Sequence, residues 1–443
     1  MRKFAAYLGQ GVHLRYFDVN PHFNGIGEIL LAEEKLDEVA LARAVDSVVR
    51  RHDSLRVGFT MDQGGYFQEI RPETPTTIFE FIEVAKNYSE NPAEFLANKA
   101  EEILTWFDIF QSRLLKVVLV RFEVLEQDRL IVLANHLICD GYSFHFLWRN
   151  ICSEYRALQA GRETAFEQPA TTLAEFTSWL EGHCLRPGFG DCLNRWARMN
   201  AAGTIGIPRQ GSTSSAADVH ANSKVLSCCL DKIRTARLEA KIQGAHHSFL
   251  HHAVMAAFLS VFAARYGTGM LPLGIWTSGH FLRAVEDAVP EFIGFCAFPV
   301  FVCLDLFTAE FSSLLALVDS TIDEITTGGA AFGLAMFHEG RPDAWLAPLR
   351  EIALPQISFN YFAGLELGRY GIKTRLAPEK ISRVKYPGNK RFREISIDYN
   401  IADGALCIQV EFSRLLHSSE EMRAILDGVE SLLHQISSAE KLP

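Results

Sequence analysis

The sequence predicts an α/β protein arranged in two lobes, and three observations support this prediction. The chain has 443 residues, which exceeds the roughly 100–200 residues of an ordinary domain. Apolar segments with strand character alternate with segments of helical periodicity in both halves. Residues 209–223 are small and polar and have no periodicity, which is typical of a linker.

The composition is that of a globular protein, and it limits the class of partner. The chain is 48% hydrophobic and 22% charged. Its formal net charge of −10 argues against nucleic acid as a partner, because phosphate contacts need a basic surface. No apolar run approaches the roughly 18–20 residues of a membrane span, and we expect neither a signal peptide nor a membrane partner. The nine cysteines are scattered without a CxxC pair, which favours free thiols and a cytoplasmic location.

The first half contains a predicted strand–loop–helix junction. Residues 113–123 and 129–135 are apolar and β-branched, and they predict two buried strands joined by a short turn. Helical spacing is found at residues 36–55 and again at 143–161. The polar stretch between the second strand and the second helix therefore lies where functional side chains are often held by a rigid scaffold.

The second half continues the alternation and ends in a hairpin and a helix. Asp403-Gly404 is typical of a tight turn between two strands. The expected helices are 189–200, 248–267 and 420–436, and the expected strands are 224–232, 271–276, 298–304, 355–364 and 394–412.

His136, Asp140 and Gly141 are the candidate catalytic residues of the junction. A histidine at the end of a strand can act as a general base near neutral pH. Asp140 either orients this histidine or turns away and holds the loop through an arginine. Gly141 allows a tight backbone and the close approach of a substrate. On spacing alone, a buried histidine bonded to the backbone is the more frequent explanation of such a pattern.

Five stretches, in chain order, resemble the motifs of one family of enzymes. The stretch "NHLICDGYS" is similar to the HHxxxDG motif, and "RRHDSLRVGF" is similar to the RHExLRTxF segment that precedes it. The family is the condensation-domain branch of the CoA-dependent acyltransferase superfamily, which includes condensation domains of nonribosomal peptide synthetases. The other three matching stretches are "LAEFTSWL", "EFIGFCAFPVFV" and "QISFNYFAG".

The resemblance implies an architecture and a donor. Each lobe would be chloramphenicol-acetyltransferase-like, a mixed sheet packed with helices, and the two would form a V around a central tunnel. We place the first lobe at residues 1–180 and the second at 181–443, with the linker in the second lobe together with segments that bridge back to the first. The donor would be an acyl group on the phosphopantetheine arm of a carrier protein. The chain would bind no cofactor of its own, and we expect a monomer.

The resemblance also assigns roles within the motif. His136 matches the catalytic histidine, which would remove a proton from the attacking amine or hydroxyl, or position it. Asp140 matches an aspartate that pairs with an arginine of the second lobe. The backbone N–H of Gly141 would help to stabilise the oxyanion. Asn135 stands where the family has its first histidine, and its amide could still support the loop. Ser143 is expected to support the same loop.

Other matches and departures lie in the second lobe. Asn360 and Tyr361 match residues expected near the tunnel. The arginine partner of Asp140 would be Arg283, unless His280 replaces it. Phe298-Pro299 replaces the family's polar pair, which puts substrate contacts at that point in doubt.

Two further features have alternative explanations. His247 and His251, in a stretch that also holds His246 and His252, are spaced to share a helix face and could bind zinc. A helix start that is rich in histidine is the more frequent explanation, so we expect no metal. Residues 378–394 are strongly basic. Such a run usually forms a solvated face, but it could also bind an acidic carrier protein or the phosphates of its arm.

The expected function is acyl transfer from a carrier-bound thioester to an amine or hydroxyl acceptor, either a small molecule or carrier-bound, in nonribosomal peptide or polyketide biosynthesis. The chain shows no adenylation signature and no carrier segment, which indicates a free-standing enzyme. One alternative is an acyltransferase that uses acyl-CoA directly. Another, favoured by Asn135, is a recruitment module that kept the fold and lost the reaction.

Overall fold

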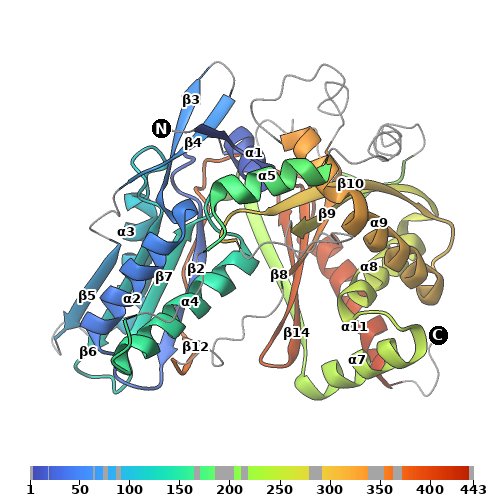
Figure 1. The fold of residues 1–443 in the computed structure, drawn as a ribbon. Helices are drawn as coiled ribbons and strands as arrows, with labels where there is room; N and C mark the ends of the chain where they lie inside the picture. The colour runs from blue at the N-terminus through green and yellow to red at the C-terminus, as the bar shows by residue number, and fades with distance from the viewer. Residues whose placement is uncertain are drawn as a thin grey trace.

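Two large sheets with their helices form two lobes that lie side by side in the computed structural model of the chain (Figure 1). The structure describes residues 3–17, 19–62, 65–72, 78–85, 91–163, 170–184, 204–210, 218–278, 292–337, 354–362 and 372–438. The predicted α/β class and the two-lobe arrangement are confirmed. The V shape, the tunnel and the boundary at residue 180 stay predictions.

The first lobe contains a five-stranded sheet in the order β12-β2-β7-β6-β5. Its central strand β7 is buried on both faces: Leu130 and Val132 belong to one hydrophobic cluster, and Ile131 and Leu133 belong to another. This explains why the strand is apolar throughout rather than alternating. The strands are β2 (Gly25–Ala32), β5 (Phe79–Val84), β6 (Leu115–Phe122), β7 (Arg129–Asn135) and β12 (Thr374–Leu376).

Helices cover both faces of this sheet. The helices α2 (Glu38–Arg51) and α4 (Gly141–Gln159) pack against each other and share the first cluster, whereas α3 (Pro92–Trp106) contributes to the second. The helix predicted over 36–55 ends at Arg51 because His52 leaves the helical conformation, and the short 3₁₀ helix η1 (Asp53–Arg56) follows. A small sheet adds β1 (Lys3–Ala5), β4 (Gly65–Ile70) and β3 (Val57–Asp62).

The second lobe contains a six-stranded sheet in the order β10-β9-β11-β13-β14-β8. Among the described strands of this sheet, β11 pairs in parallel with both of its neighbours and the other pairs are antiparallel, so the sheet is mixed. The predicted hairpin is confirmed: Asp403 and Gly404 have φ of 50° and 81° between β13 and β14. The strands are β8 (Ser223–Leu230), β9 (Gly269–Ser278), β10 (Ala297–Leu306), β11 (Ile357–Phe362), β13 (Ile395–Ala402) and β14 (Ala405–Ser413).

The helices of the second lobe pack against this sheet and against one another, to the right of β8 and β14 in Figure 1. They are α7 (Lys232–His246), α8 (Leu250–Tyr266), α9 (Phe311–Phe337) and α11 (Ser419–Ser438). The helix α9 also reaches the first lobe. The helix predicted at 189–200 and most of the predicted linker lie outside the described residues. Within the described ranges, no single helix is long and apolar enough to cross a bilayer; only α7 and α8 taken together, across the sharp bend between them, pass by length and composition.

The lobes are tied together by chain crossings as well as by packing. The strand β12 comes from the C-terminal half but pairs with β2 of the first lobe. From there, residues 377–393 return to β13 and bond to the first lobe on the way: Gly25 N donates to the Val384 carbonyl (2.7 Å), and the Asn389 side chain bonds the backbone of Asn20 in both directions. The helices α1 (Leu8–Tyr16) and α5 (Leu173–Cys184) contact α9 across the same boundary.

Close packing of α1 on β10 makes Gly9 a sensitive position. A Cβ built on Gly9 would lie 2.2 Å from the Ala297 carbonyl oxygen, which is backbone and cannot rotate away. We therefore expect Gly9→Ala to lower the free energy of unfolding by about 1–3 kcal/mol, as overpacking does. Gly244→Ala in α7 is the matched control, because nothing lies within 4 Å of its Cβ. It should stabilise the protein by up to about 1 kcal/mol in urea denaturation; equal effects of the two would contradict the packing argument.

Candidate active site

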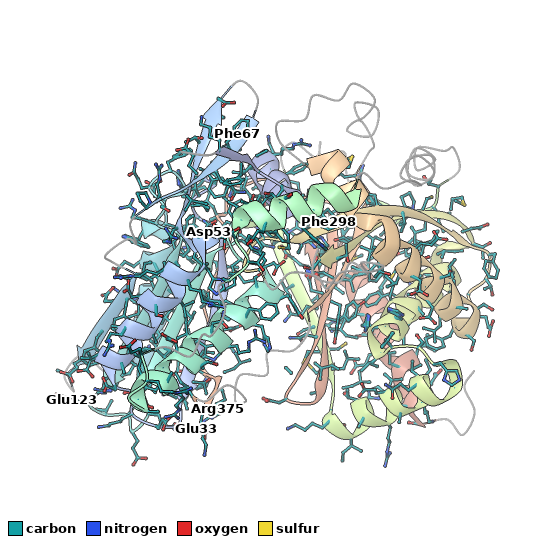
Figure 2. All side chains as sticks on the ribbon, in the orientation of Figure 1. Glu33, Asp53, Phe67, Glu123, Phe298 and Arg375 are labelled. Atoms are coloured by element: carbon teal, nitrogen blue, oxygen red, sulfur yellow. The ribbon has the colours of Figure 1, made fainter. Side chains whose placement is uncertain are left out.

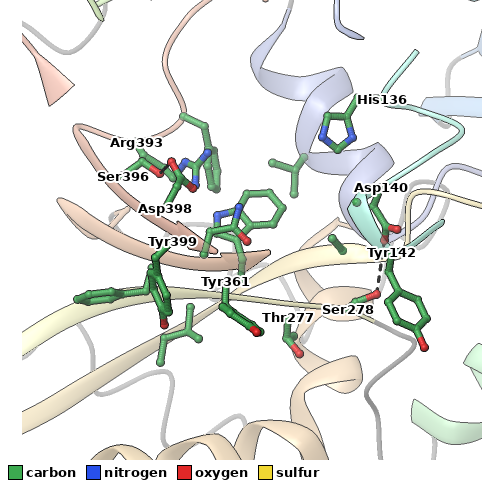
Figure 3. Close-up of a pocket in the computed structure, with 18 of the residues that line it drawn as sticks. His136, Asp140, Tyr142, Thr277, Ser278, Tyr361, Arg393, Ser396, Asp398 and Tyr399 are labelled. Atoms are coloured by element: carbon green, nitrogen blue, oxygen red, sulfur yellow. Dashed lines mark hydrogen bonds between the residues drawn. The ribbon is translucent and has the colours of Figure 1, made fainter. Parts of the chain in front are cut away.

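A cavity of about 800 Å³ lies between the two lobes. Its walls include His13, Asn24 and His136 from the first lobe and Trp276 and Tyr361 from the second. Figure 3 shows His136 and Asp140 entering from one side, and Tyr361, Asp398 and Tyr399 from strands on the other. The cavity therefore brings together residues that are far apart in sequence.

His136 follows directly after β7, and its ring is held between aromatic neighbours. Its backbone N–H donates to the Asn24 carbonyl (2.8 Å), which fixes the main chain. The ring lies 4.4 Å from that of Phe295 and 5.0 Å from that of His13, between centroids. Its Nδ1 is buried and has no hydrogen-bond partner among the described residues. Because Nδ1 is closed off while His136 borders the cavity, Nε2 is the ring nitrogen left to meet a ligand.

Burial also controls the charge of His136. It lowers the pKa of the imidazole from 6.5 to about 4, because the charged form is poorly solvated there. Burial likewise lowers the pKa of His13 well below its ordinary value, with the neighbouring His136 as a smaller cause. Both rings are therefore neutral at neutral pH, which is the form that accepts a proton.

The lowered pKa predicts the pH dependence of any reaction in which His136 acts as the base. A general base is lost when it binds a proton, so we expect kcat/KM to fall on the acid side near pH 4, rather than near 6.5. In the unfolded chain, the same histidine binds a proton below about pH 6.5. Its contribution to the free energy of unfolding is therefore present above that pH and is lost as the pH falls towards 4. Thermal unfolding measured at each pH would separate the two effects. A fall of kcat/KM centred at pH 6.5, in protein that is still folded, would contradict the lowered pKa of His136.

Asp140 turns away from His136 and holds the junction to the second lobe. Its Oδ1 accepts from the backbone N–H of Ser143 (2.8 Å) and caps α4, and its Oδ2 accepts from the N–H of Cys296 (3.1 Å). The Ser278 hydroxyl lies at 3.4 Å from the same oxygen. Of the two roles left open by the sequence, the geometry favours loop support. The expected partner Arg283, and its alternative His280, lie outside the described residues.

Asn135 and Ser143, two other residues of the motif, form hydrogen bonds that hold the loop in place, and Gly141 borders the cavity. The Asn135 side chain is fully buried, donates to the His22 carbonyl (2.8 Å) and accepts from Leu137 N (3.0 Å), so it ties the loop together. The Ser143 hydroxyl donates to the Gly294 carbonyl (2.8 Å), a second tie between the lobes. Gly141 borders the cavity as the first residue of α4, where an N–H has no acceptor within the helix.

Asn360 and Tyr361 both border the cavity from β11. The Tyr361 ring stacks on His251 with the planes at 13° and the centroids 4.6 Å apart. Phe298, at the position that departs from the family pattern and labelled in Figure 2, is fully buried and does not border the cavity.

The sequence analysis missed His13 and its partner Asn24. His13 lies on α1, and its Nδ1 is 2.6 Å from Nδ2 of Asn24. No motif marks this helix, and the pairing depends on tertiary packing of α1 beside the loop that follows β7. A single histidine in an N-terminal helix was the only available signal.

The expectation that His247 and His251 share a helix face is wrong. The helix α7 ends at His246, His247 adopts a left-handed conformation with φ 54°, and α8 begins only at Leu250. His252 instead lies with its Nδ1 2.6 Å from Oδ1 of Asp319. Within the part of the chain that the structure describes, no three metal-ligating side chains come together. The absence of a bound metal stays a prediction.

The basic segment 378–394 is ion-paired rather than uniformly solvated. Arg391 is 3% exposed, and its guanidinium lies 2.9 Å from Glu411. Lys385 pairs with the same carboxylate (3.4 Å). Its positive charge is the largest cause that lowers the pKa of Glu411 far below its usual range; Arg391 adds to this effect, and burial opposes it. Arg383 pairs with Glu101 on α3 (2.6 Å). The use of segment 378–394 as a carrier-docking surface stays a prediction.

Comparison with known proteins places the chain in a family. The sequence profile described as "Condensation domain" matches residues 16–321. Bacitracin synthase 3 of Bacillus licheniformis is 22% identical over 437 residues, which are 96% of this chain and 7% of the synthase. The chain thus spans a small fraction of the length of this relative.

Solved structures agree in fold. The epimerization domain from the third module of tyrocidine synthetase B superposes with a TM-score of 0.85 and 21% identity, covering 98% of this chain and 96% of that one. The condensation domain of the Monacolin K polyketide synthase MokA gives 0.74 and 16%, covering 99% and 98%. The two-lobed α/β fold is that of this class of domains. The chain belongs to the condensation-domain family.

Proposed function

We propose that the protein transfers an acyl or aminoacyl group from the phosphopantetheine thioester of a carrier protein to an amine or hydroxyl acceptor. The observation that supports this most is His136: its imidazole is neutral at neutral pH and borders a cavity between the lobes. A carrier-bound acyl chain and an acceptor could meet in such a cavity from different sides.

The proposed chemistry assigns a step to each group. The acceptor N–H or O–H would lose its proton to His136 as its nitrogen or oxygen attacks the thioester carbonyl. The Gly141 N–H would stabilise the oxyanion. The intermediate would then collapse with C–S cleavage, and the proton on His136 would pass to the departing thiolate. The net result is a new C–N or C–O bond and a free carrier thiol. The phosphopantetheine arm would belong to the donor substrate, and the chain itself would bind no cofactor.

A second function is epimerization of a carrier-bound aminoacyl group. The similarity to an epimerization domain, with the TM-score of 0.85, favours it. This reaction removes the α-proton of the thioester and returns a proton to the opposite face, so the acyl group stays on the carrier. His136 would be one proton-transfer group, and a group on the wall opposite would have to be the other. A non-catalytic recruitment module also stays open, because Asn135 replaces the family's first histidine and its side-chain hydrogen bonds hold the loop.

One experiment separates these functions. Carrier proteins loaded with aminoacyl groups are incubated with the protein in D₂O, with and without amine and alcohol acceptors, and analysed by intact mass and by chiral analysis of the released amino acid. Acyl loss that needs an acceptor supports transfer. Deuterium uptake with inversion and no acyl loss supports epimerization. Stable carrier binding without either, restored to turnover by Asn135→His, supports recruitment. The same acyl group offered on CoA tests the acyl-CoA alternative. A cytoplasmic location and a monomeric state stay predictions.

A further inference from the structure

The cavity wall opposite His136 has a row of polar side chains on three neighbouring strands. Asn360 on β11 is in register with Asp398 on β13, which is in register with Gln409 on β14. Register partners on adjacent strands project from the same side of a sheet, and all three residues border the cavity. Figure 3 shows Asp398 facing the cavity from the side opposite His136. The row therefore presents an amide, a carboxylate and an amide to the same space.

The carboxylate of Asp398 has unused capacity to accept hydrogen bonds. The Ser396 hydroxyl donates to its Oδ2 (2.7 Å), and among the described residues no basic side chain forms a salt bridge with it. An ionised carboxylate can accept about four hydrogen bonds. The side chain is half-buried, so water satisfies it only in part. A ligand that brings N–H donors and a positive charge would complete its coordination.

The basic side chains of this wall have other partners. The Arg393 guanidinium lies over the Trp276 ring at 5.1 Å, and its Nη1 is 3.3 Å from the Ser358 hydroxyl. Arg391 and Lys385 pair with Glu411. Asp398 is therefore a negative charge in the cavity that these cations do not pair with directly.

A primary ammonium fits this wall in charge and in hydrogen bonding. It carries three N–H donors, which match the Asp398 carboxylate and the amide oxygens of Asn360 and Gln409. A neutral acyl chain offers no such group. The nucleophilic amine of an acceptor must be uncharged when it attacks, so an ammonium held here would belong to the group whose carbonyl reacts.

We propose that Asp398, flanked by Asn360 and Gln409, binds the α-ammonium of a carrier-bound aminoacyl group. The substrate is then an amino acid with a free amine, rather than a fatty acyl or N-acylated peptidyl group. This inference rests on the proposed use of a carrier-bound thioester, and it holds for transfer and for epimerization alike.

The test uses stable probes that cannot react. Phenylalanyl-pantetheine in which an amide replaces the thioester is compared with its N-acetyl derivative by isothermal titration calorimetry. Wild type should bind the free-amine probe more tightly than the N-acetyl probe. Asp398→Asn should raise the Kd of the free-amine probe by about 10- to 100-fold, which is the range of a hydrogen bond to a charged group. It should change the Kd of the N-acetyl probe by less than about twofold. Asp403→Asn, at the turn of the same hairpin, is the matched control and should change neither.

Three results would overturn the inference. They are equal weakening of both probes by Asp398→Asn, equal binding of the two probes by wild type, and no binding of either probe at millimolar concentration. A purely structural role of Asp398 towards Ser396 predicts the first of these together with a lower melting temperature. Because the probes do not turn over, this result can be read whether or not the chain catalyses transfer.

Discussion

Turnover of carrier-bound donors is expected to fall by about 10²–10⁴-fold when His136 is replaced with alanine. This is the range that a positioned general base or acid contributes. His136 is neutral at working pH because burial lowers its pKa to about 4, so wild type has the base in its active form. The measurement is single-turnover transfer or α-deuterium exchange followed by mass spectrometry.

The fold should survive this replacement, which makes the result easy to interpret. The His136 ring contacts aromatic neighbours, and among the described residues it forms no hydrogen bond with another side chain. His434→Ala, on α11 away from the cavity, is the control for a histidine replacement and should leave turnover unchanged. Turnover of His136→Ala within about threefold of wild type, with an unchanged melting temperature, would show that another group moves the proton.

Asp140→Ala is expected to have the largest effect on stability, about 2–4 kcal/mol. Loss of the helix cap costs about 1 kcal/mol. The N–H of Cys296 is also left buried without its acceptor, at about 1–3 kcal/mol. Turnover should fall as well, because the loop between His136 and α4 loses its tie to the second lobe. Urea denaturation, followed by activity at a temperature where the variant is folded, measures both effects.

Asp231→Ala is the matched control for the cap. Asp231 caps α7 through the N–H of Arg234 (2.9 Å), but its side chain is 56% exposed and makes no tie between the lobes. Its replacement should lower the free energy of unfolding clearly less than Asp140→Ala does, because only an exposed cap is lost. Asp140→Asn keeps a cap oxygen but turns an amide group towards Cys296 N, so an intermediate loss is expected. Equal losses for Asp140→Ala and Asp231→Ala would contradict the proposed tie.

The sequence predicted the local part of the site well. A continuous apolar strand, a polar loop and a helix at 143–161 follow from periodicity, and they correspond to β7 and α4. The hairpin at Asp403 follows from the need for positive φ. These features depend on neighbours in the chain, which is why a sequence pattern contains them.

What depends on tertiary packing was not predicted. Nothing near His13 in the sequence says that α1 will lie beside the loop that follows β7, and nothing near Asp140 says that its partners are Cys296 and Ser278. The error at His247 has a local cause, because periodicity alone did not reveal the break after α7. The polar row around Asp398 depends on register across three strands, which no single segment specifies.

The crossing of residues 374–393 has a consequence for recombining such domains. A hybrid that joins the first 180 residues of this chain to the rest of a relative would pair this chain's β2 with a foreign β12. It would also lay a foreign return segment against Asn20 and Gly25. The unit that can be exchanged is therefore discontinuous: the first lobe should be transplanted together with residues 374–393. The evolution of new specificities by recombination in such a domain would be subject to the same constraint.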